Sequence, residues 1–366
     1  VSKSATVPPF TVKNAGTIEL EEGGSAGIYL VNDSKATDKI ANLSASNTGT
    51  GTTPQKGIFV KKGSSAGIYS LLTATTDKNI NNVGLIKVEG ATEEGSAGIY
   101  SKLQSTTNKL TTQNSGNIEL VQTGSAGIYA DNISTQNNAQ SEVTNTATGL
   151  IKVDGESSVG IIGKKSKITN LGTGTTKGIE VKAIKSAGIL GNTASDVTNS
   201  GRILLETTVA NSTDGLVGIS ADQTSTVTND TNGIIEIKAD YSSGISSKGG
   251  LAKNDGKIEL VNVSTVGILS TNASVENNGL TTVTPPLAKG IIITNNKAVG
   301  IYAKLNGAGS VDKTIKNNGT ISIGGTSKKG SAGIYSILEN GATKKITTSN
   351  ESIANIDVNQ EEAVGI

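Results

Sequence analysis

The chain has 366 residues, of which 34% are hydrophobic and 2% aromatic, and it contains 46 glycines but no Cys, Met, Trp or His. This composition excludes a large core of bulky side chains, disulfide bonds, and any catalytic or metal-binding role for His or Cys. The formal net charge is +1, with 32 basic and 31 acidic residues, so we expect no nucleic-acid partner.

The first predicted strands lie within residues 12–14, 18–20 and 26–30. In each of these short segments the apolar or amide side chains are two positions apart, which is the period of a β-strand. Gly and Asn separate the segments and favour turns. Because no i, i+4 stripe of a helix accompanies them, the sequence predicts three short strands in this first unit.

The same unit recurs along the whole chain, and each copy contains a Gly-Ile step. The isoleucines of this step are Ile28, Ile68, Ile99, Ile128, Ile161, Ile189, Ile219, Ile245, Ile268, Ile301, Ile334 and Ile366. An Ile-x-(Val/Leu/Ile) segment begins ten residues earlier in nine of the twelve units, which indicates a turn of fixed length. The distance to the next unit varies from 13 to 30 residues, so loops of variable length are expected at one corner.

Three strands per repeat predict an all-β chain that forms a right-handed parallel β-helix, a solenoid of about twelve coils. Each strand would pair with its counterpart one unit away, at about 4.8 Å. We expect residues 1–366 to form one elongated β-helical segment, a monomeric rod. In this fold the Gly-Ile isoleucines stack inward, and we expect the residue two positions earlier, such as Ala26 or Ala126, to line that column.

A β-branched residue followed two positions later by Asn marks the strand before the Ile-x-(Val/Leu/Ile) segment. If the first of the two faces inward, the Asn does so as well, and a buried amide requires hydrogen-bond partners. Amides stacked on successive coils can donate to one another, so we predict a structural asparagine ladder. Its predicted members are Asn14, Asn42, Asn82, Asn145, Asn170, Asn199, Asn229, Asn277 and Asn317, and Asn114 and Asn254 fit the pattern more loosely.

Six of the seven tyrosines directly follow an inward isoleucine and therefore face outward. They are Tyr29, Tyr69, Tyr100, Tyr129, Tyr302 and Tyr335. Ile162, Leu190 and Leu269 are expected to continue the apolar character of this stripe. Two interpretations remain open: the stacked rings stabilise one face of the frame, or the stripe binds a partner or stacks on a sugar.

Further contact sites are expected in the longest loops, at 43–56, 206–216 and 280–289. We predict no catalytic residue, no metal and no cofactor. A polysaccharide-cleaving β-helix would require a pair of Asp or Glu side chains. The acidic residues lie beside turns or at outward strand positions, as Glu19 and Glu119 do. The enzyme therefore remains the less favoured alternative.

The stretches NAGTIELEEGGSAGIYL (14–30) and NSGNIELVQTGSAGIYA (114–130) resemble the passenger repeats of the very large fusobacterial autotransporter adhesins, which use type V secretion. The resemblance covers essentially the whole chain. It implies an extracellular β-helical stalk on the bacterial cell surface, anchored in the outer membrane through a C-terminal barrel. The implied function is adhesion to other bacteria or to host cells, with a role in virulence.

This resemblance implies protein or glycan receptors on other cells as partners. The first residues, VSKSATVPPF, lack the regions of a signal peptide, and the last, EEAVGI, stop within a repeat. No apolar run approaches the roughly 18 residues of a membrane span. We therefore expect a fragment of a longer passenger without signal peptide, barrel or direct membrane span. A pure spacer, with the binding tip elsewhere in the parent protein, is the alternative.

Overall fold

The structure of the chain is a computed structural model. It describes residues 10–32, 43–49, 56–73, 77–90, 95–105, 108–135, 140–173, 177–207, 215–222, 224–280, 289–306, 311–324, 330–339, 344–359 and 362–366. These residues form 35 β-strands and no helix. Accordingly, this part of the chain contains no helix long and apolar enough to cross a membrane.

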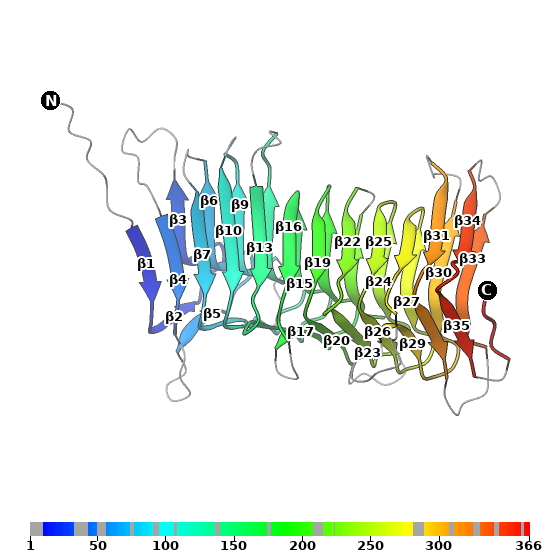
Figure 1. The fold of residues 1–366 in the computed structure, drawn as a ribbon. Coiled ribbons are helices and arrows are strands. Elements are labelled where there is room, and N and C mark those ends of the chain that lie inside the picture. The colour runs from blue at the N-terminus through cyan, green and yellow to red at the C-terminus, as the bar shows by residue number, and fades with distance from the viewer. Residues whose placement is uncertain are drawn as a thin grey trace.

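The strands form three parallel sheets that run side by side along the molecule (Figure 1). The first sheet contains β1 (Phe10–Asn14), β4 (Leu43–Asn47), β7 (Lys78–Asn82), β10 (Lys109–Asn114), β13 (Gln140–Asn145), β16 (Ser166–Asn170), β19 (Asp196–Asn199), β22 (Thr226–Asn229), β25 (Leu251–Asn254), β28 (Ser274–Asn277), β31 (Lys313–Asn317) and β34 (Ile346–Asn350). The second contains β2 (Thr17–Leu20), β5 (Gly57–Val60), β8 (Leu85–Val88), β11 (Asn117–Leu120), β14 (Leu150–Val153), β17 (Gly178–Val181), β20 (Arg202–Leu205), β23 (Ile234–Ile237), β26 (Lys257–Leu260), β29 (Gly290–Ile293), β32 (Thr320–Ile323) and β35 (Asn355–Val358). The third contains β3 (Ala26–Asn32), β6 (Ala66–Leu72), β9 (Ala97–Leu103), β12 (Ala126–Asn132), β15 (Val159–Lys164), β18 (Ala187–Asn192), β21 (Val217–Ala221), β24 (Ser243–Lys248), β27 (Val266–Thr271), β30 (Val299–Leu305) and β33 (Ala332–Leu338).

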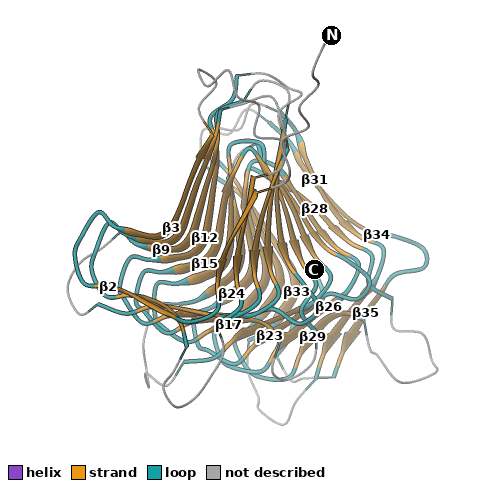
Figure 2. Cartoon of the chain, turned by 90° about the vertical axis from the view of Figure 1, so that its left-hand side faces the viewer, coloured by secondary structure: helices purple, strands orange, loops and turns teal. Residues whose placement is uncertain are grey.

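Each strand pairs with the strand three positions further along the chain, so three strands make one coil. The end-on view in Figure 2 shows the three sheets as the sides of a triangle. The register places equal positions of the repeat on top of one another: Ile28 pairs with Ile68, and Ile68 with Ile99. The predicted right-handed parallel β-helix with three strands per coil is thereby confirmed.

The core is a stack of isoleucine, valine and leucine side chains inside this triangle. On one coil, Ile118 and Leu120 of the second sheet and Ile128 of the third are fully buried. Burying such a side chain contributes roughly 1.5–3 kcal/mol. Because each coil contributes only a few such side chains, a thin core repeated many times replaces the single large core that the composition excludes.

The Gly of the Gly-Ile step also faces the interior. A Cβ atom added to Gly127 would lie 2.5 Å from the carbonyl oxygen of Gly160 and 3.1 Å from Cγ2 of the buried Ile151. Consequently Gly127 and Ile128 both point inward, and Ala126 before them lies on the outer side. The prediction that Ala26, Ala126 and their equivalents line the isoleucine column is therefore wrong, because the strict alternation of a strand is broken at the glycine.

A row of asparagine amides runs through the interior along the first sheet. From one coil to the next, each Nδ2 donates to the Oδ1 of the following Asn over 2.6–2.9 Å. The linked residues are Asn82, Asn114, Asn145, Asn170, Asn199, Asn229, Asn254, Asn277, Asn317 and Asn350. The same Nδ2 also donates within its own coil, as from Asn199 to the carbonyl of Gly201 at 3.1 Å. Buried amides are thus paired rather than left unsatisfied.

The second coil departs from the predicted ladder. Asn42 lies outside the described residues, and the register instead places Asn47 between Asn14 and Asn82. The sequence prediction required a β-branched residue two positions before the Asn, but that position is Ala45 here. At the first coil, the Oδ1 of Asn14 accepts a hydrogen bond from the backbone N–H of Gly16, in the turn that follows, at 3.1 Å.

The predicted contact loops are only partly described. Residues 43–47 of the expected loop 43–56 form β4, so that stretch belongs to the first sheet. The centres of the other two loops, 208–214 and 281–288, lie outside the described residues.

Replacing Asn199 by Ala should lower the free energy of unfolding by about 1–3 kcal/mol, because the amides of Asn170 and Asn229 each lose a buried partner. Thr198→Ala, on the outward side of the same strand, is the control and should have little effect. Unfolding in urea followed by circular dichroism measures both. Equal effects of the two substitutions would show that the ladder does not stabilise the frame.

Candidate functional site

Four tyrosine rings form a column on the outer face of the third sheet. Tyr29, Tyr69, Tyr100 and Tyr129 occupy β3, β6, β9 and β12, which are neighbours in the sheet. The ring centroids are 5.2, 5.3 and 5.1 Å apart. The first and third pairs are stacked with nearly parallel planes, whereas Tyr69 and Tyr100 meet edge to face. Both geometries are favourable for aromatic pairs.

The tyrosine stripe is not continuous along the rod. After Tyr129 the register continues through Ile162 and Leu190, and the next two coils carry Ser220 and Ser246 at this position. Apolar residues occupy this position again in the following three coils, as Leu269, Tyr302 and Tyr335. The last two rings lie 5.5 Å apart. The expected single apolar stripe is therefore divided into two patches, one near each end of the described coils.

A groove of about 740 Å³ runs along the first patch. One wall is formed by the tyrosines of the first four coils, and Ala66 and its equivalents, three residues before each tyrosine, form the floor. The opposite wall is the turn between the second and third sheets, with residues such as Ser64 and Ser157. Every described lining residue is Gly, Ala, Ser, Tyr, Val or Ile, so this part of the chain contributes no charged side chain to the groove.

The Ser of the repeated Gly-Ser-Ala-Gly-Ile-Tyr motif fixes the turn at the edge of this groove. The backbone N–H of Ser125 donates to the Oγ of Ser158 at 3.0 Å, and that Oγ donates to the carbonyl of Gln122 at 3.0 Å. The same pattern links Ser158 to Ser186 at 3.1 Å. Sequence reasoning missed this second ladder, although the repetition of Ser at one place in the motif was the available signal.

The turn residue before this Ser adopts a left-handed conformation. Gly occupies the position in several coils, but Ser64 and Ser157 also have φ values near +55°. Both side chains are exposed. The turn therefore presents serine hydroxyls at the rim of the groove, opposite the tyrosines.

The sequence that forms these coils matches the model of one protein family. A family model described as the third pectate lyase-like domain of BigA matches residues 9–247. The chain belongs to this family. The match supports an adhesin-type protein of the bacterial cell surface. No curated protein and no solved structure matches the chain.

The term pectate lyase-like describes the fold of the BigA family and does not by itself establish a lyase. Within the described coils, no group of three or more Asp, Glu, His or Cys residues is arranged to hold a metal ion. Many acidic side chains on the second sheet are instead paired with lysine or arginine. Glu19 lies 2.8 Å from Lys61, and Glu236 lies 3.0 Å from Arg202.

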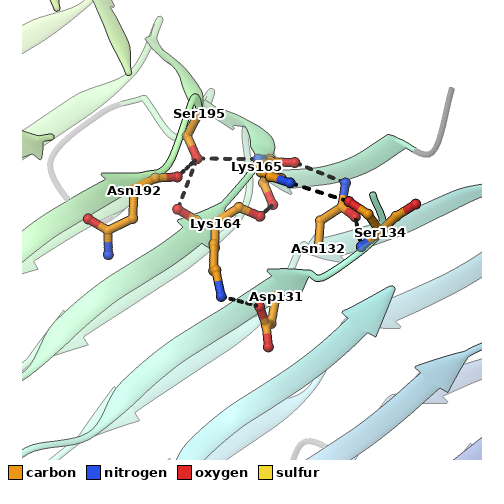
Figure 3. Close-up of polar contacts among 9 residues, drawn as sticks. Asp131, Asn132, Ser134, Lys164, Lys165, Asn192 and Ser195 are labelled. Atoms are coloured by element: carbon orange, nitrogen blue, oxygen red, sulfur yellow. Dashed lines mark hydrogen bonds and ion pairs between the residues drawn. The ribbon is translucent and has the colours of Figure 1, made fainter. Parts of the chain in front are cut away.

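An ion pair lies beside the tyrosines, on the side away from the groove. Asp131 follows Tyr129 by two residues in β12, and its carboxylate lies 3.6 Å from Nζ of Lys164 in the next coil (Figure 3). In Figure 3 the neighbouring Lys165 is held by two hydrogen bonds, from the amide of Asn132 to its carbonyl and from its Nζ to the carbonyl of Ser134. These contacts tie the ends of β12 and β15 together.

The environment of the rings favours their neutral form. Burial raises the pKa of Tyr69. Burial, followed in importance by the negative charge of Asp131 and by the neighbouring tyrosines, raises the pKa of Tyr100 to about 12. The phenol of Tyr100 therefore remains protonated, and able to donate a hydrogen bond, well above neutral pH.

Raising the pH from 10 to 12 should destabilise the domain, and Tyr100→Phe should reduce this loss. The pKa of Tyr100 is about 12 in the folded chain, against 10.0 for an unperturbed tyrosine. Because the folded state keeps its proton where the unfolded state has lost it, the contribution is complete below pH 10 and disappears as the pH rises through 12. Melting temperatures measured across this range test the effect. The same pH dependence in both proteins would contradict it.

Proposed function

We propose that this domain is a non-enzymatic segment of an autotransporter adhesin, similar to the fusobacterial passengers, and that its tyrosine groove binds receptors on other bacteria or on host cells. The proposal includes type V secretion, outer-membrane anchoring of the parent protein, a monomeric rod and a role in virulence. The observation that carries it is the uncharged groove along four consecutive tyrosines.

Exposed rings support a binding role over a purely structural one. In the groove, Tyr29 keeps 66% of its surface exposed, and the rings of Tyr69, Tyr100 and Tyr129 are partly exposed. Large apolar side chains gathered on one exposed face are typical of interaction sites. In addition, none of the six stripe tyrosines has a hydrogen bond from its hydroxyl to another described residue. These hydroxyls are therefore available to a partner.

The rod shape supports presentation at a distance. Each of two sheets contains twelve strands, and at about 4.8 Å per strand this corresponds to roughly 55 Å of axial length. A pure spacer would have the same length, but it would need neither the groove nor unpaired phenol groups. Charges on the second sheet are largely compensated by ion pairs such as Lys257–Glu259, which argues against nucleic acid as the partner.

The non-enzymatic part of the proposal rests on the described lining of the groove, which is uncharged and offers no carboxylate pair for general acid and base catalysis. Incubating the domain with polygalacturonate should therefore release no shorter or unsaturated products. Chromatography of the sugars and absorbance of the unsaturated ends measure this. Release of products that one Asp or Glu substitution abolishes would establish an enzyme instead.

The adhesive part is tested with the double substitution Tyr69→Ser and Tyr100→Ser. Beads coated with the domain should bind epithelial cells or bacteria, and the double variant should bind several-fold fewer, because the middle of the groove loses both rings. Tyr241→Ser is the matched control, since Tyr241 is 49% exposed but lies in a turn outside the stripe. Cell counts and melting temperatures are measured together.

A larger effect on melting temperature than on cell binding would make the stripe structural. Failure of the unmodified domain to bind any cell type would favour the pure spacer.

A further inference from the structure

The lining of the groove restricts the charge of its ligand. The nearest wall residues are Tyr, Ser, Ala and Gly, and among the described residues no lysine, arginine, aspartate or glutamate lines the groove. A charged ligand would lose hydration there without gaining an ion pair, which is costly. By contrast, ion pairs occur within the second sheet, as between Lys257 and Glu259 at 2.9 Å, and neither of these residues lines the groove. The groove therefore fits an uncharged ligand.

The floor of the groove also restricts the backbone of its ligand. β6, β9 and β12 are each paired on both sides, so their N–H and C=O groups are already used in the sheet. An extended peptide cannot add to these strands by backbone pairing, which is the usual way that a sheet captures a peptide. Its own amide groups would meet mainly aromatic and methyl surface. This disfavours a peptide segment as the occupant.

Available hydroxyls and rings, however, suit a sugar chain. The phenol groups of Tyr69 and Tyr100 have no hydrogen-bond partner among the described residues, and Ser64 and Ser157 are exposed at the opposite rim. A glycan has apolar ring faces that pack on aromatic side chains and many hydroxyls that exchange hydrogen bonds. The protein thus offers both kinds of contact in one groove.

We propose that the groove between Tyr29 and Ile162 binds an uncharged, extended oligosaccharide that lies parallel to the β-helix axis. This deepens the proposed adhesive function and rests on it for its biological meaning. The ring centroids of successive tyrosines are 5.1–5.3 Å apart, a step similar to the length of one sugar unit in an extended chain. Successive units would therefore meet equivalent contacts on successive coils.

The binding test uses defined oligosaccharides and the whole domain. Cellohexaose, chitohexaose and mannohexaose are the uncharged probes, and hexagalacturonate is the acidic counterpart. At least one uncharged hexasaccharide should bind, measured by isothermal titration calorimetry, and its disaccharide should bind at least about tenfold more weakly because it contacts fewer coils. Tighter binding of hexagalacturonate than of every uncharged probe would overturn the proposal, as would no binding of any uncharged hexasaccharide.

Substitutions locate the site. Tyr69→Ser with Tyr100→Ser should weaken binding of the bound hexasaccharide about tenfold or more, and Tyr241→Ser should leave it unchanged. The double variant Tyr69→Phe with Tyr100→Phe keeps the rings and removes the hydroxyls, so it should weaken binding to a smaller extent. Because its rings remain in place, it also serves as the test if the serine variant does not fold. Unchanged affinity in both double variants would overturn the proposal.

Treatment of the target cells separates this inference from the adhesive function. Periodate, which cleaves sugar diols, should abolish binding of the coated beads, and proteinase treatment of the cells should leave a substantial part of it. If proteinase alone abolishes binding, adhesion stands and the glycan proposal fails. If the domain binds an uncharged hexasaccharide but no cells, the glycan proposal stands and the adhesive function fails.

Discussion

Each coil satisfies its hydrogen bonds in the next coil, and the rest of this structure depends on that pairing. The backbone groups of each strand pair with the strand one coil away, and from Asn82 to Asn350 one side-chain amide per coil does the same. The amides all donate in one direction, from Asn82 towards Asn350. A slip of one residue would turn the Asn and its apolar neighbours outward. Backbone and side-chain pairing thus select the same register.

The repeated six-residue motif serves this constraint and the groove at once. Its Ser links successive turns, its Gly permits close approach of the next coil, and its Ile fills the core, as Ser125, Gly127 and Ile128 show. Its Ala and Tyr remain on the outside and line the groove. The Ser, the second Gly and the Ile of the motif therefore build the frame, and its outward Ala and Tyr belong to the candidate site. This division explains how one face can be modified while the frame stays intact.

Much of the architecture was accessible from sequence because the spacing between repeats reports directly on register. The three strands per coil and the outward position of the tyrosines followed from period-two patterns. The alanines were misplaced because two consecutive residues, Gly127 and Ile128, face inward, and a period-two pattern does not show such a break. Asn47 was missed because the neighbouring Ala45 did not match the expected β-branched type. The groove itself depends on the shape of the turns and has no sequence signature.

Because each complete coil from β7 to β33 contributes one strand to each sheet and one member to the amide row, the rod changes length without damage only in whole steps. Removing residues 151–178, for example, would bring Leu150 directly before Ile179, an equivalent place in the next coil. Recombination between repeats in the gene would produce such deletions and duplications readily. A protein of this kind can therefore change its length in increments of one strand spacing, and the same events would move or divide the aromatic patch.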